Sequence, residues 1–445
     1  MKKWIPVAAA AAVVVTLSAS AWYCGLRAEQ ALQQQLASMQ TNPAIKLELA
    51  NYERGLFRSH GALRIRLLGA DSALTGSDSP VLFEQPFTVV HGPILWDSAF
   101  AFRPAAFGVK TQLHAQPEWP QDFKTILADE RVRLISRIGF TGATHTQLRI
   151  AEGDLQLSTG TLALQRGELQ VDYDPSDKAM VADLTWPGLH FSNETGTLEM
   201  ADMGFHWAGT YYSQNLQIGS GDYHLGKVSA KQGEMDAFTL TQLQLSAKQG
   251  LDPSGEQVNS AVDMKLAGVN FIGQEMVKDG SMHLEINKLS VSALQNLDKH
   301  NGANMTPEQL QNMFGDLMAL FQHGAELKIE PLTATVQGQP LQLNLLARMP
   351  VADANAPVSD PSALFQQTEI DLNLKAAQPL LAAWAPAELI ALMEQSGQQD
   401  ALVVKVRAGQ ITVNGLPYAS DSSTADDSDA TMDDSEELAE DESSI

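Results

Sequence analysis

The chain has almost no cysteine: Cys24 is the only one in 445 residues. An internal disulfide is therefore excluded, although an exported protein could carry one. Local zinc-binding patterns are also missing, because none of the ten histidines lies within five residues of another. Stability must come from burial of apolar side chains, and the length allows two or three domain-sized cores.

Catalytic motifs are missing as well. The sequence contains no Gly-x-Ser-x-Gly elbow, phosphate-binding loop, His-Glu-x-x-His motif or dinucleotide-binding fingerprint. Gly219–Asp222 resembles a nucleophile turn only superficially, and a hairpin tip explains it better. We therefore assign no catalytic residue, no cofactor and no metal ligand, and we expect that the protein is not an enzyme.

Basic residues are scarce. The chain has 29 Lys and Arg against 53 Asp and Glu, a net charge of −24. Eleven of the acidic residues lie in residues 419–445, which contain no basic residue. A surface of this sign repels phosphate backbones, so nucleic acid is excluded as a partner. Residues 419–445 are predicted to form a disordered, solubilising tail, with docking of a basic partner or buffering of divalent cations as alternatives.

Long apolar runs are absent except at the N-terminus, where residues 5–22 follow Lys2 and Lys3 without a charged residue. This is the pattern of an export signal or membrane anchor. We favour a retained transmembrane helix, because Trp22 and Tyr23 suit a membrane interface and a helical pattern continues through residues 23–40. Cleavage after Ala21 is the alternative. Either way, residues from about 24 onward are expected to be exported, and residues 5–22 hold the chain in the membrane if the segment is kept.

Alternation of apolar and polar residues dominates from residue 45 to residue 418. Leu63, Ile65 and Leu67, for example, alternate with two arginines. This period of two is typical of antiparallel strands with one solvated face. The predicted fold class is mainly β with a few helices (α+β): an N-terminal transmembrane helix, a large antiparallel β-meander or curved sheet with covering helices, and a disordered acidic tail.

Two further patterns refine this prediction. A Gly-x-Leu-x-[Leu/Val] sequence recurs at seven-residue steps through residues 153–171 and predicts the starts of short strands. Helices that cover the sheet are predicted at residues 121–129, 306–323 and 379–395, the last broken near Pro386. The expected units are residues 1–22 (anchor), 23–40 (helical stalk), 41–350 (β-rich periplasmic region), 351–418 (C-terminal helix and closing strands of the same unit) and 419–445 (tail).

The densest group of bulky apolar residues lies between Phe83 and Trp119. Most of it is expected to be core. A partly open apolar groove is the alternative, since an exported sheet with one apolar face could hold an acyl chain. The candidates for contact with lipid or a protein partner are Phe57, Phe87, Trp96, Phe100 and Phe102.

The segment Tyr52-Glu53-Arg54-Gly55-Leu56-Phe57-Arg58-Ser59 stands about thirty residues after the apolar run. Together with the Lys-containing start, the Gln-rich helix and the closing residues 409–417, it resembles the YdgA-like family of Gram-negative envelope proteins, a domain of unknown function. The resemblance covers residues 1–418 and implies a periplasm-facing protein tethered to the inner membrane, with self-association as a further expectation. We interpret the motif residues as structural, with partner binding as the alternative: Tyr52, Arg54, Gly55, Leu56, Phe57 and Ser59.

Three hypotheses for function follow. A non-enzymatic envelope scaffold or assembly factor is favoured, because it needs neither an open apolar face nor a cluster of catalytic groups. A carrier or binder of lipid along an apolar β-face is the second, and an unrecognised hydrolase is the third.

Overall fold

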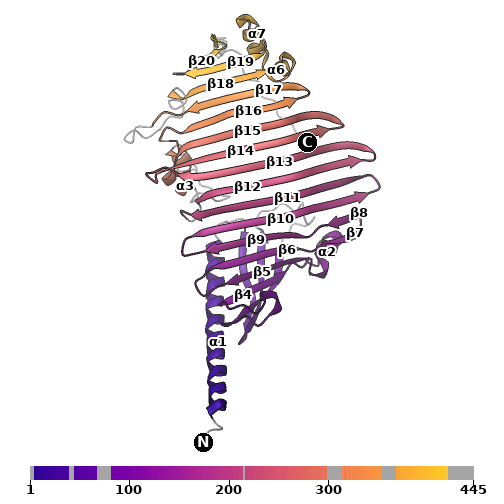
Figure 1. The fold of residues 1–445 in the computed structure, drawn as a ribbon, viewed down its shortest axis with the longest axis vertical. Helices are drawn as coiled ribbons and strands as arrows, with labels where there is room; N and C mark the ends of the chain where they lie inside the picture. The colour runs from indigo at the N-terminus through magenta and orange to yellow at the C-terminus, as the bar shows by residue number, and fades with distance from the viewer. Residues whose placement is uncertain are drawn as a thin grey trace, which may run out of the picture.

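The computed structural model describes residues 5–39, 45–67, 82–213, 216–297, 313, 315–317, 319–321, 323–351 and 367–418. A long helix, α1 (Ile5–Met39), precedes one antiparallel sheet that contains all 21 strands of these residues. The strands stack away from α1, and α1 projects beyond the N-terminal end of the stack (Figure 1). The prediction of a mainly β fold built on a large antiparallel sheet is confirmed.

The strands of the N-terminal half of the sheet are mostly short. They are β1 (Ile45–Arg54), β2 (Arg58–Leu67), β3 (Leu82–His91), β4 (Phe107–Gln112), β5 (Val132–Ile138), β6 (Thr144–Ile150), β7 (Gly153–Leu157), β8 (Gly160–Leu164) and β9 (Gly167–Asp174). Six long strands follow: β10 (Ala179–Asn193), β11 (Gly196–Tyr211), β12 (Gln217–Gln232), β13 (Met235–Leu251), β14 (Gln257–Phe271) and β15 (Gln274–Ser290). The last six are β16 (Glu326–Val336), β17 (Gln339–Arg348), β18 (Glu369–Ala376), β19 (Ala401–Arg407), β20 (Gln410–Val413) and β21 (Leu416–Tyr418).

Strand pairing follows the chain with one departure. Strands β1 to β6 pair in order, β9 pairs with both β6 and β10, and β10 to β21 continue in order. Strands β7 and β8 form a hairpin that pairs through β8 with the second half of β10. Gly153, Gly160 and Gly167 each begin a strand, so the repeat marks strand starts as predicted.

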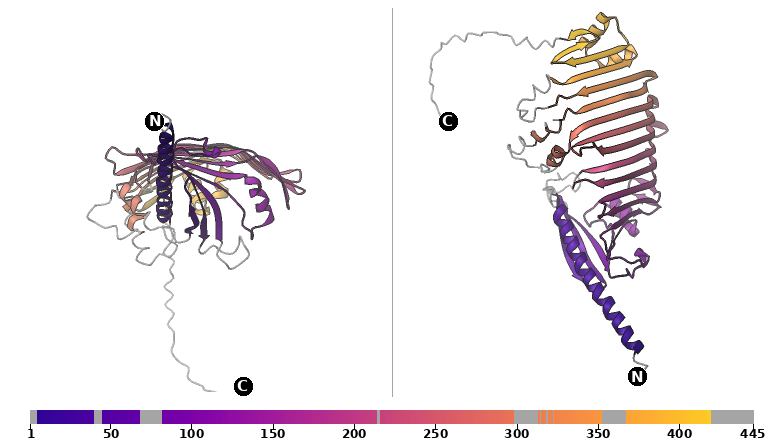
Figure 2. Two further views of the ribbon diagram at one scale, coloured as in Figure 1. Left: turned by 90° about the horizontal axis from the view of Figure 1, so that it is seen from below. Right: turned by 60° about the vertical axis from the view of Figure 1, so that its left-hand side comes forward.

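Each long strand has one polar and one apolar face. Asp183, His206, Asp222, Ser246, Asp263 and His283 stand opposite one another in a row across β10–β15. The adjacent row, whose side chains point to the other face, consists of Leu184, Phe205, Tyr223, Leu245, Met264 and Met282. The sheet is curved, as Figure 2 shows. The alternation in the sequence therefore reports which side chains share a face.

A line of skipped pairs crosses these six long strands. Along this line, each of the five neighbouring strand pairs leaves one residue of each strand unpaired: Pro187, Asp202, Gly226, Gln242, Ala267 and Asp279. Asp202, Gln242 and Asp279 have φ values of 56°, 50° and 49°, which side-chain-bearing residues seldom adopt. Such irregularities bend strands and increase their twist.

Helices are few. The predicted helix at 121–129 is α2 (Gln121–Leu127), and the predicted broken helix at 379–395 is α6 (Gln378–Trp384) followed by α7 (Ala387–Ser396). Pro386 stands immediately before α7, which explains the break. A short helix, α3 (Val291–Leu297), follows β15. The predicted helix at 306–323 falls mostly outside the described residues, of which 313, 315–317 and 319 are helical.

Apolar cores lie at both ends of the sheet. At the C-terminal end, Leu380, Leu381 and Met393 of α6 and α7 pack with Leu402 and Val413. At the N-terminal end, α1 packs on β3 and β4. No helix within the described ranges is both long and apolar enough for a bilayer crossing, so the predicted transmembrane helix is not confirmed.

Candidate functional site: the docked helix and the groove beside it

Helix α1 docks on the sheet through small side chains. Ala21 and Ala28 have no exposed surface, and Ala28 packs with Val89 of β3 and Phe107 of β4. Gly25 lies between them along the same face of the helix, and a Cβ atom there would lie 2.7 Å from Cε1 of His91. The spacing of four and three residues therefore forms a smooth stripe that lets the helix backbone approach β3 closely.

His91 joins the helix to two strands. Its ring is 1% exposed, with Nδ1 2.9 Å from the Ala21 carbonyl oxygen and Nε2 3.0 Å from Oγ of Ser59, which is fully buried. A carbonyl can only accept, so Nδ1 carries the proton and Nε2 accepts from the Ser59 hydroxyl. Burial lowers the pKa of His91 and the charge of Arg54 lowers it further, which together outweigh the raising effect of the Ala21 hydrogen bond. The ring is therefore a neutral link between α1 and the sheet.

Three side chains of the Tyr52–Ser59 motif contact α1 or the side chains that hold it in place. Tyr52 packs against the apolar cluster that contains Ala28, and its ring lies beside that of Phe87, with centroids 6.4 Å apart. Ser59 donates to His91, as described above. Arg54 places Nη1 3.2 Å from Oε2 of Glu29 and its guanidinium 5.6 Å from the ring centroid of Trp22. We call Tyr52, Ser59, Val89, His91 and Phe107 the helix-docking surface.

The other motif residues form the turn between β1 and β2. A Cβ atom on Gly55 would lie 2.2 Å from the carbonyl oxygen of Arg58, so only glycine fits this close approach. Leu56 and Phe57 point outward and are 47% and 39% exposed. The motif therefore combines a surface that docks α1 with a turn that presents two apolar side chains.

A groove runs between the other side of α1 and the sheet. Its volume is about 1400 Å³, and its floor comes from β4–β6 and β9–β11. Val109, Ile138, Val171, Tyr173 and Met180 belong to this floor. The arrangement gives an apolar surface with a helix as one wall, which suits a long hydrophobic ligand.

The helix wall of the groove is more polar. Tyr23, Cys24, Arg27, Gln30 and Gln34 line it. Nε of Arg27 donates to the Tyr23 hydroxyl at 3.0 Å. Burial raises the pKa of the Cys24 thiol and outweighs the hydrogen bond from Gly92, so this thiol stays protonated and is not an activated nucleophile.

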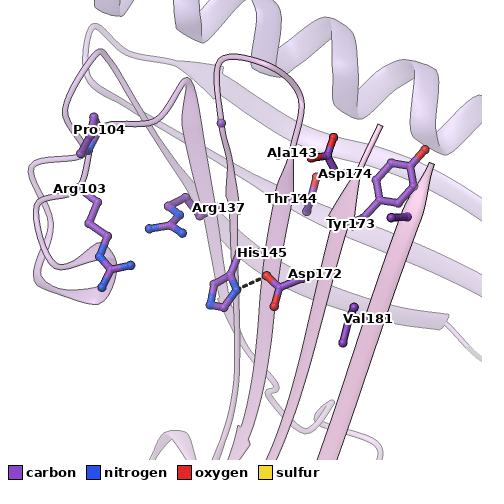
Figure 3. A pocket seen from close by; sticks show the side chains of 12 residues that line it. Arg103, Pro104, Arg137, Ala143, Thr144, His145, Asp172, Tyr173, Asp174 and Val181 are labelled. Carbon is purple, nitrogen blue, oxygen red and sulfur yellow. Dashed lines mark hydrogen bonds and ion pairs between the residues drawn. The ribbon is translucent and has the colours of Figure 1, made fainter. Parts of the chain in front are cut away.

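A second pocket of about 500 Å³ opens on the opposite face of the same strands. In Figure 3, His145 points toward Asp172, and Nδ1 lies 2.5 Å from Oδ1. Burial raises the pKa of Asp172, but hydrogen bonds from Gln170 and His145 outweigh it and the net pKa is lowered. Arg103, Arg137 and Asp174 complete the charged lining.

This second pocket is a weaker candidate for a functional site than the groove beside α1. Its lining contains no serine or cysteine that the His145–Asp172 pair could activate. The described part of the chain also holds no group of three or more His, Cys, Asp or Glu side chains that could bind a metal ion. The pair is an ordinary cross-strand contact between β6 and β9.

The predicted contact residues separate into two groups. Phe87 packs beside α1, and Phe100 is 4% exposed in a core with Val90 and Leu95. Trp96 and Phe102 are 56% and 57% exposed, and their ring centroids are 6.3 Å apart. The sequence interpretation missed Gly25 and His91. The Ala21–Gly25–Ala28 spacing was the one local signal for the docking face of α1.

Comparison with known proteins identifies a family for this chain. The family model described as a bacterial protein of unknown function (DUF945) matches residues 1–412. The chain belongs to this family. Protein YdgA of Escherichia coli (strain K12) is 22% identical over 389 residues, which cover 80% of this chain and 77% of that protein. No solved structure matches. The resemblance inferred from Tyr52–Ser59 is thereby confirmed, and the acidic tail, residues 419–445, lies beyond the residues that the family model matches.

Proposed function

We propose that this DUF945 protein is a carrier that holds the acyl chain of an anionic amphiphile in the groove between α1 and the sheet. The observation that supports it most is the groove itself, about 1400 Å³ with an apolar floor. Ligand pockets are commonly 300–1,000 Å³. A groove of this size suits an extended hydrocarbon chain better than a compact polar metabolite.

The charges around the groove favour an anionic head group. The described lining contains Arg27 and Lys178 and no acidic side chain. This is notable in a chain with 53 acidic and 29 basic residues. A phosphate or carboxylate head group can pair with either cation while its hydrocarbon chain contacts Val171 and Met180.

The sequence alone favoured a scaffold, because covering helices could have closed the apolar face. Along the groove, however, α1 and the apolar face of the sheet leave space between them instead of packing closely. Binding of a hydrophobic molecule is therefore the better supported hypothesis. It requires no catalytic group, and we propose no enzymatic activity.

Loading of the groove can be tested on the full-length protein purified in mild detergent. Native mass spectrometry with lipid extraction should show a stoichiometric anionic lipid. The larger side chain of Val171→Trp occupies part of the groove and displaces about two methylene groups of the acyl chain. Burial of these groups is worth ~1.6 kcal/mol, so the affinity for the lipid should fall a little more than tenfold. Gln170→Trp is the matched control, since it adds the same bulk to the opposite face of β9.

Lipid retained by Gln170→Trp and reduced in Val171→Trp would support the carrier. Equal lipid in both variants would place the ligand elsewhere. A lipid-free wild-type protein, under conditions that keep lipid on a known carrier, would overturn the proposal and favour the scaffold.

We also propose that residues 5–22 tether the protein to the inner membrane, with the sheet in the periplasm. Support comes from the sequence, where Lys2 and Lys3 precede a run without charges. The full chain is then expected to resist alkaline extraction from membranes and to be digested by protease added to spheroplasts. Release at alkaline pH, or protection from that protease, would contradict the tether.

A further inference from the structure

Exposed aromatic side chains gather where α1 leaves the sheet. Phe57 comes from the β1–β2 turn, and Trp96 and Phe102 come from the connection between β3 and β4. Trp22 and Tyr23 lie on α1 and are 50% and 52% exposed. We call these five residues the aromatic rim. Large exposed aromatic residues grouped in this way mark a surface that meets another apolar phase.

The position of the rim along α1 is fixed by contacts. Phe57 and Trp96 line a cavity of about 410 Å³ together with Leu17 and Ser18 of the helix. One turn farther along, the Ala21 carbonyl accepts from His91. Phe57 and Trp96, with Phe102 against Trp96, therefore lie beside α1 at the level of residues 17–21. Trp22 and Tyr23 continue the rim on the helix itself.

Helix length then sets the depth of the rim. From Ile5 to Leu17 the helix rises twelve steps of about 1.5 Å, or roughly 18 Å. A bilayer hydrocarbon core is about 30 Å thick. The part of α1 free of the sheet is too short to cross it, so a helix inserted as far as Trp22 must bring the neighbouring loops down to the membrane surface.

We propose that the aromatic rim inserts into the interfacial layer of an anionic lipid bilayer. The inference rests on the proposed tether and adds a second, sheet-borne contact with the membrane. Tryptophan and other aromatic rings favour this layer, where an apolar body meets polar head groups. Lipid head groups carry negative charge that can pair with Arg103, on the β3–β4 connection, and with the exposed side of the Arg58 guanidinium at the start of β2.

The connection that carries Trp96 and Phe102 is rigid. Leu95 and Phe100 are buried in its core. Asp97 is 6% exposed and holds the connection in place, with Oδ2 2.8 Å from Nζ of Lys110 and 3.3 Å from Nη2 of Arg58. The exposed rings are thus presented by a fixed scaffold, and little ordering entropy opposes their insertion.

The test uses the full chain reconstituted into phosphatidylethanolamine–phosphatidylglycerol liposomes that contain lipids brominated near the carbonyl end. Emission of Trp96 is taken as the difference between the wild type and Trp96→Phe. It is expected to fall about twofold relative to liposomes without bromine, as for a ring in the interfacial layer. Trp384→Phe provides the control, because Trp384 is 59% exposed on α6 at the far end of the sheet.

Quenching of the Trp96 difference, with the Trp384 difference unchanged, would support insertion of the rim. Protein that floats with the liposomes but shows an unquenched Trp96 would overturn the inference and leave the tether standing. Protein that does not float would overturn the tether, and this inference with it.

Discussion

Replacing Gly25 with leucine is expected to separate α1 from the sheet. A Cβ atom at this position would lie 2.7 Å from Cε1 and 2.9 Å from Nδ1 of His91. The ring cannot yield, because the Ala21 carbonyl and the Ser59 hydroxyl hold both of its nitrogen atoms. Overpacking and the loss of these hydrogen bonds together should cost about 3 kcal/mol of docking free energy.

Cys24 gives a direct measurement of this separation. It is the only cysteine in the chain and is 7% exposed against the sheet. In Gly25→Leu, maleimide labelling of Cys24 should become at least about tenfold faster, as expected for a docking loss above 1.4 kcal/mol. Gly250→Leu in β13 is the matched control, since a Cβ there would meet no atom within 4 Å. Labelling at the wild-type rate in Gly25→Leu would show that α1 does not dock through Gly25.

Replacing His91 with leucine should have an effect of similar size. Leucine fills a similar volume but leaves the buried Ser59 hydroxyl without its acceptor and removes the donor to Ala21. Buried polar groups that lose a partner cost about 1–3 kcal/mol each, so we expect a loss of about 2–4 kcal/mol in unfolding free energy. Denaturant titration of both proteins measures it.

The same variant should change the pH dependence of stability. Because the pKa of His91 is lowered in the folded protein, the unfolded chain binds a proton more readily. The contribution of His91 is therefore complete well above the ordinary value of 6.5 and is lost as the pH falls below it. Between pH 8 and pH 5, the melting temperature of the wild type should fall more than that of His91→Leu. His114→Leu, which alters an exposed histidine, is the control. If its melting temperature fell less than that of the wild type by the same amount as in His91→Leu, the assignment of this pH dependence to His91 would be contradicted.

Much of the fold could be predicted because it is recorded in local patterns. Alternation predicts strands, since side chains on a strand point to opposite faces. The glycines at 153, 160 and 167 mark strand starts, and Pro386 interrupts a helical pattern. The order of the strands was less accessible. The β7–β8 hairpin sits beside the second half of β10, and only pairing between distant residues determines that arrangement.

The candidate site was beyond sequence reasoning because its parts come from distant segments. Ala21, Ser59 and His91 lie on three different elements, and no local spacing relates them. The aromatic residues show the same limit. Phe100 and Phe102 are two positions apart, yet one is buried and the other exposed, because the connection after β3 folds over its own core instead of forming a strand.

The number of strands in the meander also sets the distance between the two ends of the sheet. Strand β4 contacts α1, and fifteen successive pairings lead from it to β21. At about 4.8 Å for each neighbouring strand, the path along the sheet is roughly 70 Å. Helices α6 and α7 lie at that distant end (Figure 1), so anything they meet is held at a distance set by strand number. Adding or removing one hairpin would alter that reach by about 10 Å and preserve the direction of every other strand.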